Sequence, residues 1–148
     1  MEIADFLSPT DVIVNASAPD KKRLLTDLCR KAASTLNLDP DRVTADILKR
    51  EGLGSTGLGD GIAIPHARLA DLNKPIGVLA KLKKSIDFDA IDRQPVDIVF
   101  LLLLPTTGAG EQLNILALVS RTLRDADVVR NARHATDAAA LFAAMVKF

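Results

Sequence analysis

A glycine-rich stretch followed by a histidine constrains this chain more than any other feature. Five of the chain's eight glycines fall within the ten positions from Gly52 to Gly61. Glycine loses more conformational freedom on ordering than any other residue, so this density excludes a regular helix or a well-packed strand. A short apolar run, Ile62 to Ile64, comes next, and Pro65 and His66 follow it. We therefore predict a sharply turning loop that leads into a buried strand, with His66 as the functional residue at the end of that strand.

The order of elements argues against a nucleotide-binding loop. The string Gly52-x-Gly54-x-x-Gly57 matches the dinucleotide fingerprint, but that fingerprint needs a strand before the glycines and a helix after them. Here a helical pattern precedes the glycines and a strand pattern follows them. A P-loop is excluded because no Gly-Lys-Ser/Thr closes the run. The residues alone leave two interpretations open: a functional loop, or a long structural turn in front of an ordinary core histidine.

The side chains around the loop suit the handling of a phosphoryl group. A neutral imidazole is a good nucleophile near pH 7, because the ordinary pKa of histidine is about 6.5. A phosphoryl group on His66 would need donors for its oxygens, and Arg50 is a planar, permanently charged donor. Ser55 and Thr56 would add hydroxyls, and the backbone N–H groups around Gly57 could surround an anion. The spacing by itself leaves open whether these groups converge.

The run from Arg50 to His66 also resembles a family signature. Its pattern, Arg-Glu-x-x-Gly-Ser-Thr-Gly-x-Gly-x-Gly-Ile-Ala-Ile-Pro-His, is similar to that of the fructose/mannitol-type IIA domains of the bacterial phosphotransferase system (EIIA type 2), and looks most like the nitrogen-regulatory members. The likeness continues in residues 86–92 and 94–96. It implies one such domain over residues 1–148, with His66 as the phosphorylated histidine and Arg50 helping to hold the phosphoryl group. No metal or cofactor is implied.

One position departs from the pattern of that family. Many members carry a second active-site histidine at the start of a late helix, in a stretch like Gly-Glu-His-Leu. This chain reads Gly110-Glu111-Gln112-Leu113 there, so Gln112 takes the place of the histidine. An amide can donate a hydrogen bond to a phosphoryl oxygen or to His66, but it cannot carry a proton or a positive charge. The departure therefore bears on the efficiency of phosphoryl transfer and leaves His66 as the acceptor.

Hydrophobic periodicity predicts helices on both sides of a small mixed sheet, in an α/β arrangement of the α+β sandwich type that the resemblance also implies. Residues 96–104 are continuously apolar after Asp97, as expected for a strand covered on both faces. Arg50 should lie in the last turn of the second helix, and Gln112 in the first turn of the third, where free N–H groups favour an anion. The expected helices span about 20–36, 39–51, 111–123, 125–131 and 136–146, and the expected strands 12–14, 62–64, 76–82 and 96–104.

Composition narrows the class of protein further. The chain is 48% apolar and carries 19 basic and 19 acidic residues, which suits one globular domain and gives no bulk charge for nucleic acid. The single cysteine, Cys29, lies on the apolar face of a helix and fits a reducing cytoplasm.

No secretory signal is expected, and the longest apolar run, 98–104, is far short of the roughly 20 residues of a membrane helix. Arg68 and His134 are expected to be solvated loop residues, and the aspartates of 87–95 a solvated loop rather than a metal site.

Two functions of different classes follow. In the first, the protein is a phosphocarrier, a transferase component rather than a stand-alone enzyme, whose His66 accepts a phosphoryl group from an HPr-like (NPr) carrier protein. In the second, it is a regulatory binding module in which phosphorylation of His66 changes affinity for a target protein, such as a transporter or a sensor. The expected absence of a fused transporter domain and the presence of Gln112 favour regulation. A third hypothesis, a nucleotide-binding domain, predicts saturable binding of a nucleotide.

Overall fold

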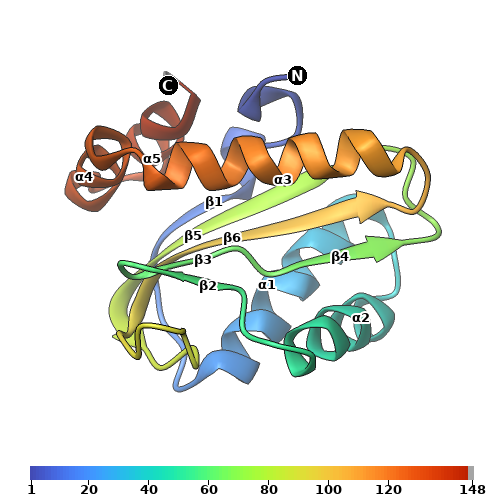
Figure 1. Cartoon of the computed structure of the whole chain (residues 1–148), viewed down its shortest axis with the longest axis horizontal. Coiled ribbons are helices and arrows are strands. Elements are labelled where there is room, and N and C mark those ends of the chain that lie inside the picture. Colours follow the sequence, from blue (N-terminus) through green and yellow to red (C-terminus); the bar gives the residue numbers. More distant parts are fainter. Residues whose placement is uncertain (147–148) are drawn as a thin grey trace.

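The computed structural model describes residues 1–146 and has three layers, with a mixed sheet between two layers of helices (Figure 1). This is the sandwich that the sequence predicts. The helices are α1 (Lys21–Leu36), α2 (Pro40–Gly52), α3 (Ala109–Arg124), α4 (Ala126–His134) and α5 (Ala138–Val146). The strands are β1 (Val12–Ala16), β2 (Gly57–Gly59), β3 (Ile62–Ala63), β4 (His66–Leu69), β5 (Ile76–Ile86) and β6 (Val96–Pro105), and two 3-10 turns, Ile3–Asp5 and Pro9–Asp11, precede β1.

Strand β6 is the centre of the sheet. The strand order is β1-β5-β6-β3-β2, and β4 also pairs with β6. Strand β5 runs antiparallel to β6 on one side, while β3 and β4 run parallel to it on the other. Ile62 is paired with Ile98 and His66 with Leu102, so β3 and β4 lie in line along one edge of β6. The two short strands together form the edge of the sheet that carries His66.

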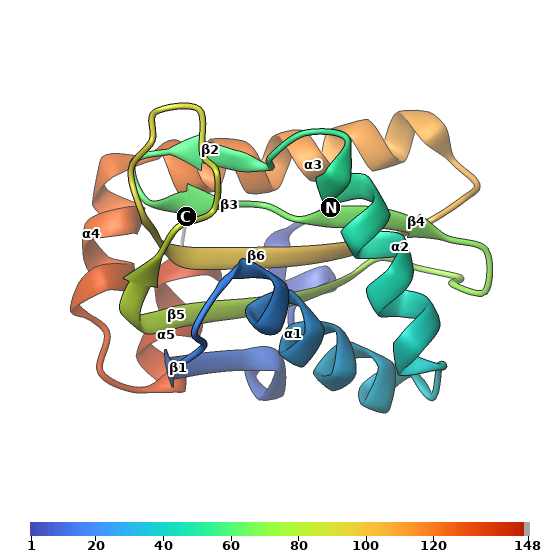
Figure 2. The same cartoon turned by 90° about the horizontal axis from the view of Figure 1, so that it is seen from below.

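Side chains of β6 alternate between two apolar cores. Phe100, Leu102 and Leu104 are buried with residues of α3, α4 and α5, whereas Leu101 and Leu103 are buried with residues of α1 and α2. Figures 1 and 2 show these two groups of helices on opposite faces of the sheet. Because both faces are covered, the strand is apolar without alternation, and the predicted core strand is confirmed.

The surroundings of His66 differ from the prediction in one respect. The sequence predicts a strand over 62–64 with His66 at its end and a connection after it, but His66 begins a second strand, β4. Proline has no N–H to donate to a neighbouring strand, so Pro65 interrupts the pairing with β6. Its carbonyl still accepts a hydrogen bond from the Leu102 N–H at 2.9 Å, and regular pairing resumes at His66. The predicted connection directly after His66 is therefore wrong.

Other boundaries also move. The glycine stretch contains β2, because Gly57 and Gly59 pair with β3 through the backbone alone and need no side chains. Strand β5 continues to Ile86, four residues beyond its predicted end. His134 is the exposed last residue of α4 rather than a loop residue before the final helix, which begins at Ala138. In the described part of the chain, no helix has both the length and the apolar character needed to cross a membrane.

Candidate active site

A cavity of about 480 Å³ opens at the sheet edge between the end of α2 and the start of α3. Three elements bring polar groups to it: the last turn of α2 supplies Arg50, β4 supplies His66 and Arg68, and the first turn of α3 supplies Gln112. The other residues that line it are Asp46, Lys49, Leu53, Ala67, Leu104, Leu113 and Leu116. The structure thus brings together the three residues that the sequence predicts for the site, namely Arg50, His66 and Gln112, from separate parts of the chain.

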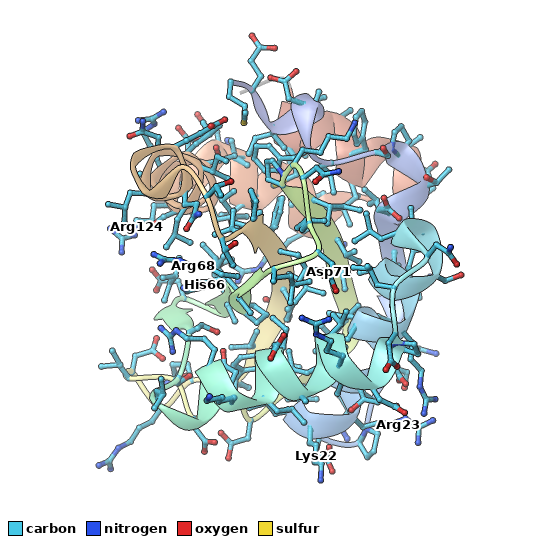
Figure 3. All side chains as sticks on the ribbon, turned by 90° about the vertical axis from the view of Figure 1, so that its right-hand side faces the viewer. Lys22, Arg23, His66, Arg68, Asp71 and Arg124 are labelled. Atoms are coloured by element: carbon cyan, nitrogen blue, oxygen red, sulfur yellow. The ribbon has the colours of Figure 1, made fainter. Side chains whose placement is uncertain are left out.

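The alternation of β4 aims His66 into this cavity. Successive side chains of a strand point to opposite faces. Ala67 and Leu69 are buried in the core beneath α1 and α2, so His66 and Arg68 point to the other side. Figure 3 looks at this edge and shows His66 and Arg68 next to each other, between α3 and α2. The prediction of Arg68 as a loop residue is therefore wrong, and its spacing of two from His66 was the signal in the sequence.

The His66 ring is held with one nitrogen buried in a hydrogen bond. Its Nδ1 lies 2.8 Å from the carbonyl oxygen of Ile64, and because a carbonyl only accepts, Nδ1 carries the proton and Nε2 keeps its lone pair. Burial lowers the pKa of His66 below its ordinary value of 6.5, and the charges of Arg50 and Arg68 lower it further. The bond to Ile64 and the charge of Glu51 act in the opposite direction. At neutral pH the imidazole is therefore uncharged.

Arg50 is fixed beside the cavity at both of its ends. Its backbone belongs to the last turn of α2, and its Nη1 donates to the carbonyl oxygen of Gly54 at 3.0 Å. A guanidinium has five N–H donors, and this bond uses one of them. With Lys49 and Arg68, Arg50 gives the cavity three cationic side chains against one carboxylate, that of Asp46. The site therefore has a local excess of positive charge in a protein of zero net charge.

Ser55, Thr56 and Gly57 do not belong to the described residues that line the cavity. The hydroxyl of Ser55 donates to the Phe88 carbonyl at 2.8 Å and accepts from the Gly57 N–H at 3.1 Å. Thr56 directs its N–H and its hydroxyl to the Glu51 carboxylate. These bonds tie the glycine-rich loop to α2 and to the segment around Phe88. The predicted role of the three residues in holding a phosphoryl group stays a prediction.

Gln112 is tied to the loop that precedes α3. Its amide nitrogen donates to the carbonyl oxygens of Pro105 and Thr107, the latter at 2.7 Å. The side-chain oxygen is buried and has no hydrogen-bond partner among the described residues. The amide N–H groups that the sequence offers to a phosphoryl oxygen are thus engaged by the backbone, an arrangement with no local signal in the sequence.

The fold and this site define a class of protein. Residues 5–147 match the family model described as "Phosphoenolpyruvate-dependent sugar phosphotransferase system, EIIA 2", and the chain belongs to this family. It is 39% identical over 145 residues to a nitrogen regulatory protein of Bradyrhizobium diazoefficiens, covering 98% of this chain and 95% of the relative. The family resemblance seen in the sequence is confirmed.

Solved structures agree with this assignment. The nitrogen regulatory protein IIA-Ntr of Neisseria meningitidis superimposes with a TM-score of 0.92 at 29% identity, over 97% of this chain and 98% of that one. The enzyme IIA for mannitol of Escherichia coli, solved in complex with phosphorylated enzyme IIB, has a TM-score of 0.77 at 17% identity, over 93% and 95% of the two chains. The second likeness is one of fold.

Proposed function

We propose that this protein is a phosphocarrier whose His66 accepts a phosphoryl group from a phosphorylated HPr-like (NPr) carrier protein in a regulatory phosphotransferase system. The observation that carries the proposal is the orientation of His66. Its protonated Nδ1 is held by Ile64, and its unprotonated Nε2 belongs to a ring that lines a cavity with Arg50 and Arg68. The proposal places the protein in the cytoplasm with its phosphoryl donor.

The reaction is an in-line displacement at phosphorus. The Nε2 lone pair forms the new bond to phosphorus, while the bond from phosphorus to the donor atom of the carrier breaks and its electron pair leaves with the carrier. Positive charge develops on the imidazole, and the Nδ1–H bond to the Ile64 carbonyl strengthens as it does. Arg50 and Arg68 stabilise the negative charge on the phosphoryl oxygens. None of these steps needs a further residue to take up a proton.

The rim of the cavity suits a transient protein partner. Leu53 and Leu113 are 82% and 65% exposed, on the α2 and α3 sides of the cavity, and the half-buried Leu116 lies one turn beyond Leu113. Large exposed apolar side chains around a functional group are typical of docking surfaces. The mannitol relative that forms a complex with a phosphorylated enzyme IIB gives the proposal a precedent within this fold.

Intact-mass spectrometry after incubation with phosphoenolpyruvate and the donor proteins tests the proposal. We expect one acid-labile phosphoryl group on the wild type and on His134→Gln, and none on His66→Ala. His134 is the matched control, because it is the chain's other histidine and is exposed. If the wild type stays unphosphorylated under conditions in which the donor protein is phosphorylated, the carrier mechanism is excluded. The Gln112→His variant measures what the missing second histidine costs in rate.

Regulation by phosphorylation is a second candidate, favoured by Gln112. Its amide N–H groups are bound to Pro105 and Thr107 rather than free, so the site is less equipped to pass the phosphoryl group on. In this proposal, phosphorylated and free His66 present different charge to a target protein such as a transporter or a sensor. A chase of labelled protein with cell extract separates the two. Rapid loss of label to a second protein supports onward transfer, while retained label with altered binding supports regulation.

A further inference from the structure

We infer that Lys21, outside the signature and on a different helix, is a positioning residue for His66. A chain of contacts leads from the Lys21 ammonium through Glu51, Thr56 and Ile64 to Nδ1 of His66. The inference rests on the proposed function in that it takes His66 as the reacting group. The first quantity that tests it is the pKa of the His66 ring, which is measured without any phosphoryl donor.

The chain begins at a largely buried ion pair. The Lys21 Nζ lies 2.8 Å from Oε2 of Glu51, and the two side chains are 18% and 4% exposed. Lys21 also donates to the Phe88 carbonyl at 3.2 Å and lies 4.6 Å from the centroid of the Phe88 ring. Removing one partner of a buried pair leaves an uncompensated charge. Lys21 therefore determines how Glu51 is held and how much of its charge is neutralised.

Glu51 then positions the strand that carries His66. Its carboxylate accepts from the N–H of Thr56 at 3.3 Å and from the Thr56 hydroxyl. The Thr56 carbonyl accepts from the Ile64 N–H at 3.1 Å, and the Ile64 carbonyl accepts from Nδ1 of His66 at 2.8 Å. Each residue in this series is held by the one before it. The carbonyl that orients the His66 ring is thus located by a carboxylate that Lys21 holds.

The position of Lys21 in its helix supports a tertiary role. Lys21 is the first residue of α1, directly after the N-cap Asp20. A cation at a helix N-terminus interacts unfavourably with the helix dipole. Its neighbour Lys22 is exposed and projects from the surface (Figure 3). The local structure therefore gives no reason for a half-buried lysine at this position, whereas the contact with Glu51 does.

The charges around His66 determine whether removal of Lys21 raises or lowers the pKa of His66. Helix α2 contributes Asp46, Lys49, Arg50 and Glu51, and β4 contributes Arg68. The α3 residues that line the cavity, Gln112, Leu113 and Leu116, are all uncharged. Of the charged residues, Glu51 is the one whose charge Lys21 neutralises directly. Without Lys21, the carboxylate attracts a proton on His66 more strongly. The imidazolium is then favoured and the pKa of His66 rises.

The test compares Lys21→Met with Lys22→Met by NMR titration of His66, in a His134→Gln background that leaves one histidine to observe. We expect Lys21→Met to raise the pKa of His66 and Lys22→Met to leave it unchanged. The phosphorylation rate of Lys21→Met at acidic pH should fall roughly two- to fivefold, because a raised pKa leaves less of His66 as the neutral imidazole. Lys21→Arg should restore both values.

Identical His66 titrations and phosphorylation rates in the two methionine variants would overturn the inference. If Lys21→Met does not fold, Lys21→Gln decides, because it also removes the ammonium and should raise the pKa of His66. An unchanged pKa in that variant also overturns the inference. A wild type that accepts no phosphoryl group removes the proposed function, while the titrations still decide whether Lys21 acts on the ring.

Discussion

His66 combines a half-buried ring with two neighbouring cations, and this combination decides its protonation state. Burial is the largest influence and lowers the pKa, with Arg50 and Arg68 adding to it. The hydrogen bond to Ile64 opposes them, but it also fixes which nitrogen carries the proton. A ring that is neutral at pH 7 with Nε2 unprotonated is the form that the proposed phosphoryl transfer requires. Burial and the two cations together make His66 unfavourable to protonate in the folded state.

This cost predicts a pH dependence of stability. The folded-state pKa of His66 lies below 6.5, so the unfolded chain binds the proton more readily, and this residue's contribution to stability rises with pH up to about 6.5. We expect the urea midpoint of the wild type to fall as the pH is lowered below that value. The fall should be smaller in His66→Gln and unchanged in His134→Gln. Equal pH slopes in all three proteins would contradict the assignment.

At the scale of elements, the glycine-rich loop connects α2 to β3 and is held against the loop between β5 and β6. The Asp92 side chain of that second loop accepts from the Asp60 N–H at 3.0 Å, and Figure 2 shows the loop beside β2. The close approach depends on Gly57, where an added Cβ would lie 2.8 Å from Cβ of Ala90. Glycines in this stretch are therefore not equivalent, because only some of them meet a neighbouring segment.

Two alanine substitutions separate these cases. Gly57→Ala forces the loops apart and should lower the free energy of unfolding by about 1–3 kcal/mol. Gly52→Ala, at the last residue of α2, meets no atom within 4 Å and should be neutral or stabilise by up to about 1 kcal/mol. Urea unfolding of the two variants measures the difference. Equal stability of the two would show that the loops do not pack as described.

At the scale of the whole molecule, two apolar cores on opposite faces of the sheet hold the layers together. Cys29 on α1 belongs to the core between the sheet and the first two helices and is fully buried. Burial raises the pKa of its thiol to about 12, with a weaker opposing effect of a hydrogen bond to Thr44. A buried thiol of this kind is unreactive, because the thiolate is the nucleophile.

Cys29 should therefore report global unfolding. We expect a thiol reagent such as a disulfide dye to leave the native protein unmodified at pH 8, because the thiol is both inaccessible and protonated. In urea, modification should appear with the same midpoint as the loss of helical circular dichroism. Prompt modification in native buffer, or a lower midpoint than the dichroism gives, would mean that α1 opens separately from the rest of the core.

The sequence by itself determined the five helices and the central strand, and it singled out His66 as the candidate reactive residue. Helical periodicity and the continuously apolar run of β6 are local patterns, and the structure contains both. The run from Arg50 to His66 indicated the protein family, because it resembles the family signature. Such features can be predicted from the sequence because each depends on residues close together in the chain.

Only the tertiary structure decided which side chains surround His66. Arg68 joins the cavity because Pro65 divides the strand and β4 forms beyond it, pairing with a strand more than thirty residues later in the chain. The amide of Gln112 is engaged by loop carbonyls, and Lys21 reaches His66 through three intervening residues. These contacts join segments that no periodicity links. Their existence depends on how the layers pack, and that is a property of the folded chain.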